Sequence, residues 1–189
     1  MSEPSNSDDD LLTMTLEAFA DTIIPGEKRW PGDRAIAGVS DGGGAVASGA
    51  IELLRTPATG ITEGVDSLAA MLNAHAAAYA AERGLPLDDD VAEFVSLGYE
   101  HRAALVRQLT TPGHPEKEGW VSLALFCNMA YDSAAHLHTA DAIAAGHPGL
   151  TAMRIGTPDD DGRWRFRAYS YRRALADVHP GTTASGSPA

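Results

Sequence analysis

Hydrophobic residues recur at the spacing of an α-helix along most of the chain. The first stripe has spacings of four, three and four residues, which places its members on one helix face. It consists of Leu12, Leu16, Phe19 and Ile23. A longer stripe runs through residues 62–83, with Gly84 and Pro86 after it as stop signals. Shorter helical patterns occur around residues 46–54, 91–95 and 97–110. These patterns predict an all-α fold, an irregular helical bundle.

The segment from 119 to 146 differs from the others because it is apolar on nearly every face between Val121 and Ala130. A helix that is hydrophobic all round is typical of the interior of a bundle. We therefore predict that this segment is the central buried helix, with the remaining helices around it.

The hydrophobic pattern is interrupted between residues 25 and 45, which contain two prolines and six glycines. This composition predicts a long Gly/Pro-rich loop after the first helix. Residues 1–10 are polar and acidic, and residues 181–189 are small and polar, so both ends are predicted to be disordered tails. Between them we expect a single helical domain, residues 11–180, with an extended C-terminal arm from about residue 150.

Composition and charge exclude several classes of partner. The chain has 189 residues, with 26 acidic against 14 basic side chains and a net charge of −12, which disfavours nucleic acid as a partner. The sequence lacks an apolar run long enough to span a bilayer, so no membrane insertion is expected. A single cysteine, Cys127, cannot form an internal disulfide. Together with the acidic N-terminus, which does not resemble a secretory leader, this predicts a cytoplasmic protein.

Polar residues at helical spacing within the apolar segment are the candidates for catalysis. Asn128, Asp132 and His136 are four residues apart, which would place them on one helix face. A carboxylate one turn before a histidine can fix its tautomer and raise its basicity, as a general base requires. The same pair also occurs as a purely structural ion pair, and both interpretations stay open. The candidate catalytic set is Asp132, His136, His138 and Tyr131.

No metal site is expected from the sequence. His75, Glu100, His101 and His147 are the available additional ligands, and none of them has the spacing of a known metal motif.

Arginines alternate with aromatic residues near the C-terminus, between residues 163 and 171. Arginine and aromatic side chains are enriched at protein interfaces, because a planar guanidinium bonds carboxylates bidentately and aromatic rings bury area with little loss of entropy. The alternative is that these arginines neutralise the chain's own acidic bundle. The candidate partner-binding residues are Arg163, Trp164, Arg165, Phe166, Arg167, Tyr169 and Tyr171, together with Trp30 in the loop.

The string LEAFADTIIPG at residues 16–26, followed by Pro31-Gly32 and by Ala37-Gly38-Val39, resembles the gluconate 2-dehydrogenase subunit 3 family. The rest of the chain is more similar to an uncharacterised actinobacterial branch of that family. Asp33 stands where the family usually has alanine. The residues that carry the family motif are Asp21, Thr22, Pro25, Pro31, Gly32 and Gly38.

The resemblance implies a non-catalytic accessory subunit that stabilises or matures a flavin-dependent oxidoreductase of the glucose–methanol–choline (GMC) type. Such a subunit has no cofactor of its own, and the FAD belongs to the partner. One alternative is a stand-alone enzyme that uses Asp132, His136 and His138 for acid–base or metal-assisted chemistry on a small apolar substrate. Another is a small-molecule binding module, which needs only a cavity.

Overall fold

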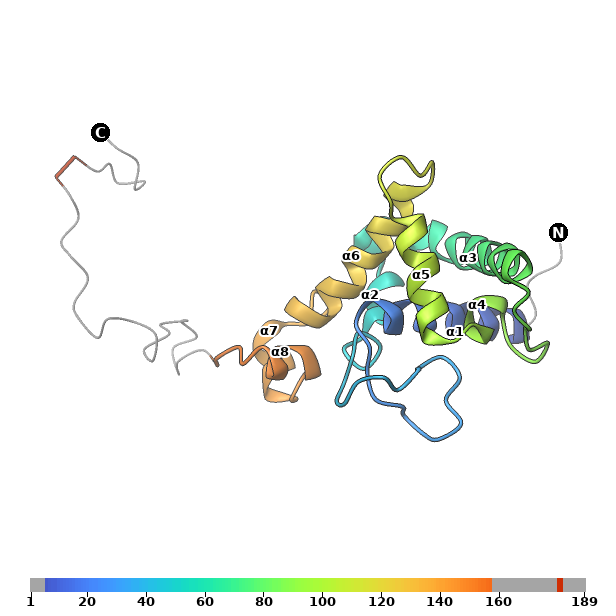
Figure 1. Ribbon diagram of the computed structural model, residues 1–189. Helices are drawn as coiled ribbons and strands as arrows, with labels where there is room; N and C mark the ends of the chain where they lie inside the picture. The colour runs from blue at the N-terminus through green and yellow to red at the C-terminus, as the bar shows by residue number, and fades with distance from the viewer. Residues whose placement is uncertain (1–5, 158–179, 182–189) are drawn as a thin grey trace. The chain divides into compact units, whose positions relative to one another are not determined.

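The computed structural model describes residues 6–157 and 180–181. The chain forms two compact units, residues 1–155 and 156–189, and all the helices of the described part belong to the first unit (Figure 1). The fold is all-α, as predicted. None of the described helices is long and apolar enough to cross a membrane. The helices are α1 (Asn6–Ile23), α2 (Ala50–Leu54), the 3-10 turn η1 (Pro57–Thr59), α3 (Thr62–Arg83), α4 (Glu93–Ser96), α5 (Tyr99–Leu109), α6 (Lys117–Ser133), α7 (Thr139–Ala144) and α8 (Pro148–Ala152).

The helix at the centre of the bundle is α1. It packs against α2, α3, α4, α5 and α6 (Figure 1). Leu16 and Phe19, which belong to the first predicted stripe, are fully buried. Helix α3 also has the predicted bounds, and it buries Val65, Ala69 and Leu72 against the same core. The hydrophobic periodicity therefore predicted correctly which faces of α1 and α3 are buried.

The prediction of one continuous central helix from 119 to 146 is wrong. Helix α6 ends at Ser133, and the backbone of Ala134 is left-handed, with φ of 48°. That conformation breaks the helical hydrogen-bond ladder, and α7 begins only at Thr139. The buried Ala134 packs with Ala142 and Leu150 in a small second core. The sequence did not reveal this turn because no glycine or proline marks the end of the helix there.

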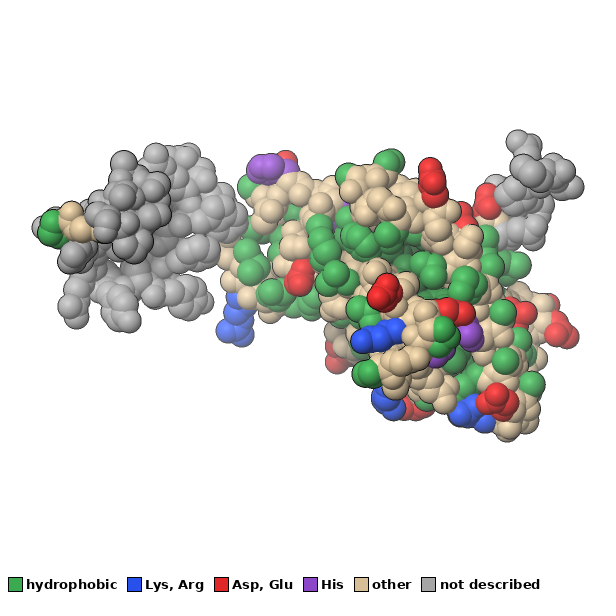
Figure 2. All heavy atoms as spheres, turned by 90° about the horizontal axis from the view of Figure 1, so that it is seen from above, with side chains coloured by type: hydrophobic (Ala, Val, Ile, Leu, Met, Phe, Trp, Pro, Cys, Tyr) green, Lys and Arg blue, Asp and Glu red, His purple; other side chains and the backbone are tan. Residues whose placement is uncertain are grey.

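Helix α6 is also not buried all round. Its inner face is formed by Trp120, Leu123 and Cys127, all fully buried. On the outer face Val121 is 42% exposed and Leu125 is 55% exposed. On the face of the molecule shown in Figure 2, hydrophobic side chains gather near the middle.

The ends of the chain differ from their prediction at one point that the structure describes. Residues 1–10 were expected to be a disordered tail, but α1 begins at Asn6. Asp9 and Asp10 lie in its first turns, where their charge complements the positive end of the helix dipole. Most of the predicted C-terminal arm and tail, residues 158–179 and 182–189, lies outside the described residues.

The long loop after α1 is present as predicted, and its two ends are hydrogen-bonded to each other. Glu27 N–H donates to the Gly42 carbonyl at 2.8 Å, and Ala45 N–H donates to the Ile24 carbonyl at 3.0 Å. A Cβ added to Gly44 would overlap the Ile24 carbonyl, so the two backbone segments approach each other as closely as glycine allows. We call residues 25–45 the braced loop.

The close approach at Gly44 predicts a steric cost. Gly44→Ala should lower the free energy of unfolding by about 3 kcal/mol, since the methyl group meets backbone atoms that cannot rotate away. Gly64→Ala is the matched control, because Gly64 lies in α3 with open space around it. This control should be neutral or slightly stabilising. Urea unfolding of both variants measures the difference, and equal stabilities would contradict the proposed closure of the loop.

Candidate functional site

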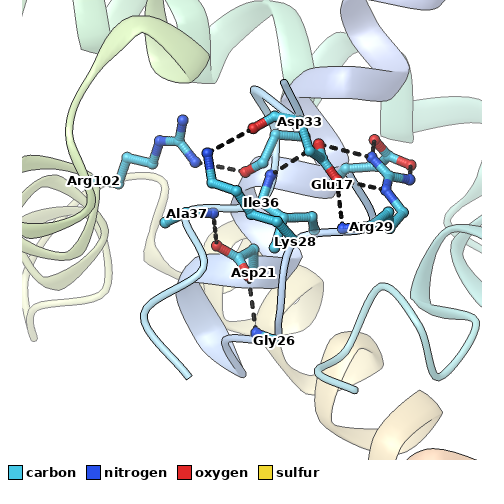
Figure 3. Close-up of polar contacts among 10 residues, drawn as sticks. Glu17, Asp21, Gly26, Lys28, Arg29, Asp33, Ile36, Ala37 and Arg102 are labelled. Atoms are coloured by element: carbon cyan, nitrogen blue, oxygen red, sulfur yellow. Dashed lines mark hydrogen bonds and ion pairs between the residues drawn. The ribbon is translucent and has the colours of Figure 1, made fainter. Parts of the chain in front are cut away.

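Asp21 fixes the start and the middle of the braced loop to α1. Its side chain is 1% exposed and accepts hydrogen bonds from Gly26 N–H at 3.0 Å and from Ala37 N–H at 2.9 Å (Figure 3). Burial raises the pKa of Asp21, against the opposing effect of these two hydrogen bonds. One carboxyl group thus connects three points of the chain.

Asp33 holds the outer part of the loop through Arg29. The Asp33 carboxylate is 1% exposed, and Arg29 Nε donates to it at 2.7 Å. Arg29 also donates to both oxygens of Glu17 on α1, at 2.6 and 2.8 Å (Figure 3). Burial by itself would raise the pKa of Asp33, but the hydrogen bonds from Arg29 and Ile36 outweigh it and hold the pKa low. The residue that departs from the resembled family's motif therefore has a structural role here.

Arg102 joins α5 to the same loop. It is 4% exposed, and its guanidinium donates to four backbone carbonyls. Two are in the loop, Ala35 at 2.7 Å and Arg34 at 3.1 Å, and the other two are those of Leu97 and Val95. Burial lowers its pKa to about 10, so it stays protonated at neutral pH.

The sequence analysis missed Arg102, although a signal was present. Arg102 precedes Leu105, Val106 and Leu109 by three, four and seven residues, which places an arginine on the buried face of α5. An arginine at a core position predicts a cluster of acceptors nearby, because a buried charge needs partners.

The family-motif residues serve mainly to shape the loop. Thr22 Oγ1 donates to the Ala18 carbonyl at 2.7 Å inside α1, and Pro25 follows the end of that helix. Pro31 and Gly32 form a tight turn that Asp33 N–H closes on the Trp30 carbonyl at 3.0 Å. Gly38 has a φ of 70°, a conformation that favours glycine.

The braced loop presents two large apolar side chains to solvent. Trp30 is 54% exposed and Val39 is 53% exposed. The Arg29 guanidinium lies 4.7 Å from the centre of the Trp30 ring, where it supports the ring by a cation–π contact. The loop thus carries exposed apolar groups on a backbone that hydrogen bonds hold in place.

Asp132 and His136 do not share the predicted helix face. Asp132 lies on α6 and is exposed, whereas His136 and His138 lie beyond the end of that helix. His138 is 76% exposed, with Nδ1 at 3.7 Å from Asp141 Oδ2. Within the described part of the chain, Asp132 has no hydrogen bond or ion pair with either histidine, and Tyr131 is half-buried where α8 meets α6. The geometric argument for a shared pocket is therefore wrong, because the turn at Ala134 separates these side chains.

His136 packs instead against α2. Its ring lies on Gly49, which has a φ of 83° and no room for a Cβ. His136 Nδ1 and Ser48 Oγ are buried without a hydrogen-bond partner in the described chain. Nearby, His147 Nε2 donates to the Ser48 carbonyl at 3.0 Å, since its Nδ1 accepts from Leu150 N–H. Burial lowers the pKa of His136, and the proximity of His147 contributes in the same direction.

A histidine–carboxylate pair that the sequence did not indicate lies at the other end of α6. His75 Nε2 and Glu116 Oε2 are 2.7 Å apart, and Trp120 Nε1 donates to the same oxygen at 3.1 Å. The hydrogen bond from His75 lowers the pKa of Glu116. These residues are 41 positions apart in the chain, which is why no spacing rule could pair them.

The other residues considered in the sequence analysis do not join the side-chain clusters described above. Cys127 is fully buried in the core, and burial raises the pKa of its thiol to about 12, which makes it unreactive. Among the residues that the structure describes, no group of three or more His, Cys, Asp or Glu side chains is placed to hold a metal ion. The arginine and aromatic residues from Arg163 to Tyr171 lie outside the described residues.

Replacing Arg102 tests the brace directly. Arg102→Lys should lower the free energy of unfolding by about 2–4 kcal/mol, because an ammonium group cannot reach four carbonyls at once. It should also speed tryptic cleavage after Lys28 and Arg34 in the loop. Arg107→Lys on the exposed face of α5 is the control and should change neither property. Unchanged cleavage in Arg102→Lys would contradict this role.

The lowered pKa of His136 predicts a pH dependence of stability. Below its ordinary pKa of 6.5 the unfolded chain binds a proton at His136 that the folded chain resists, so stability falls as the pH drops through that value. His136→Gln should flatten this part of the profile. Urea unfolding between about pH 5 and 8 measures both profiles, and parallel curves for the parent protein and the variant would refute the assignment.

Comparison with known proteins gives one match. No curated protein and no solved structure is significantly similar to this chain. A family model described as a family of unknown function, DUF5987, matches residues 10–189, which is nearly the whole sequence. The chain is therefore a member of the DUF5987 family.

Proposed function

We propose that this protein is a non-catalytic accessory subunit that binds and stabilises a flavin-dependent oxidoreductase of the GMC type. The class of partner comes from the resemblance of residues 16–39 to the gluconate 2-dehydrogenase subunit 3 family. In this proposal the FAD and the catalytic groups belong to the partner. The proposed location of the complex is the cytoplasm.

The observation that supports this proposal is the braced loop with its exposed Trp30. A loop that is already fixed in the free protein loses little conformational entropy when it binds. Tryptophan and arginine are the residue types that contribute most to protein interfaces, and here Arg29 lies against the Trp30 ring. Val39 adds a second exposed apolar group on the same loop.

The polar groups under the loop favour the same conclusion. Asp21, Asp33 and Arg102 form hydrogen bonds with the chain's own backbone and side chains. These hydrogen bonds hold the braced loop in place. The outer surface of the loop is therefore the part that can contact another molecule. The alternative of a stand-alone enzyme has lost its geometric support, because Asp132, His136 and His138 point to different surroundings.

A copurification experiment tests the proposal. A tagged copy of the chain, expressed at native level in its own host, should retain a GMC-type flavoprotein, identified by its flavin spectrum and its peptide masses. Trp30→Ala should weaken the complex by about 2 kcal/mol, or about 30-fold in Kd, which is typical of a central aromatic contact.

Leu137→Ala is the matched control, since Leu137 is 49% exposed and lies in the α6–α7 connection. It should leave the affinity unchanged. Recovery of the chain alone would count against the proposed partner, and equal retention by Trp30→Ala and the parent protein would count against the loop.

A further inference from the structure

A second surface feature lies at the opposite end of α1 from the braced loop. The start of α1, helix α3 and the segment that leads into α4 border an open groove with a volume of about 480 Å³, within the range of small-molecule sites. Its apolar lining includes Leu11, Leu12, Ala70 and Val91. Leu11 is 37% exposed, so the groove leaves part of this apolar lining in contact with water.

The polar rim of the groove is acidic. Asp89, Asp90 and Glu93 line it, and no lysine or arginine is among the described residues that do. The neighbouring Asp88 is neutralised by Arg34 at 2.6 Å, whereas these three acids have no ion pair in the part of the chain that the structure describes. Two more exposed aspartates, at positions 9 and 10, lie on the first turns of α1 next to Leu11.

We propose that this groove binds an organic ammonium ion with an apolar body, a lipophilic amine. The hydrocarbon part would cover Leu11, Leu12 and Val91, and the ammonium group would lie at the acidic rim. The apolar contact supplies affinity, because it removes hydrocarbon surface from water. The unpaired carboxylates supply selectivity, because they attract a cation and repel a carboxylate of the same shape.

This inference does not rest on the proposed accessory function. The groove and the braced loop share no residue, and a lipophilic amine can bind whether or not a flavoprotein is present. An uncharged ligand would leave the acidic rim unused, and an anion would be repelled by it.

Three probes of equal chain length test the charge preference on the full-length protein. Octylammonium, octanol and octanoate are titrated below their aggregation limits by isothermal calorimetry and by backbone amide NMR. We expect saturable 1:1 binding of octylammonium, with shifts centred on Leu11, Leu12, Ala70 and Val91. Octanoate should bind at least about tenfold more weakly, and salt should reduce the difference.

Two sets of variants separate the groove from unspecific attraction. Neutralising the rim with Asp89→Asn, Asp90→Asn and Glu93→Gln should weaken octylammonium about tenfold. The control carries the same change in net charge at exposed sites away from the groove and should bind like the parent protein. It combines Asp41→Asn, Glu63→Gln and Glu118→Gln.

The second set of variants tests whether filling the groove prevents binding. Ala70→Leu places a bulkier side chain into it at little cost to helix α3 and should abolish saturable binding. Ala74→Leu, one turn further along α3 and outside the groove, should not. The inference is overturned if octylammonium does not saturate, if octanoate binds equally well, or if the two leucine variants behave alike.

Discussion

The long loop after α1 stays on the bundle because a buried guanidinium holds it there. Arg102 is taken out of water on α5, and its charge is compensated by backbone carbonyls of the loop and of the segment around α4. A buried charge of this kind is stable only if it is paired or well hydrogen-bonded. The loop must therefore keep its carbonyls in place, which explains how a segment with six glycines takes one conformation.

The two buried aspartates complete this arrangement from the other side. Asp21 accepts hydrogen bonds from two backbone N–H groups. Asp33 accepts hydrogen bonds from Arg29, which also donates to Glu17 on α1. Donors and acceptors of the loop are thus paired internally, and its apolar side chains are left for solvent or a partner. Trp30 is one of these exposed apolar side chains.

Charge is distributed unevenly over the described residues. Arg29, Arg34 and Arg102 are bound to acids or carbonyls of the chain itself. The acids around the groove at the start of α1 have no such partner there. Unpaired acids therefore lie beside an apolar groove, and the proposed binding of a cation rests on this combination.

The sequence by itself determined the helical class, the inner faces of α1 and α3, and the loop between residues 25 and 45. Periodicity and Gly/Pro content are local properties, and local properties are visible in one sequence. The tertiary structure decided the rest. The turn at Ala134 follows from packing against α7 and α8, and it separates Asp132 from His136, which spacing had placed one turn further along the same face. The brace at Arg102 joins residues more than 60 positions apart, and only the folded chain brings such distant donors and acceptors together.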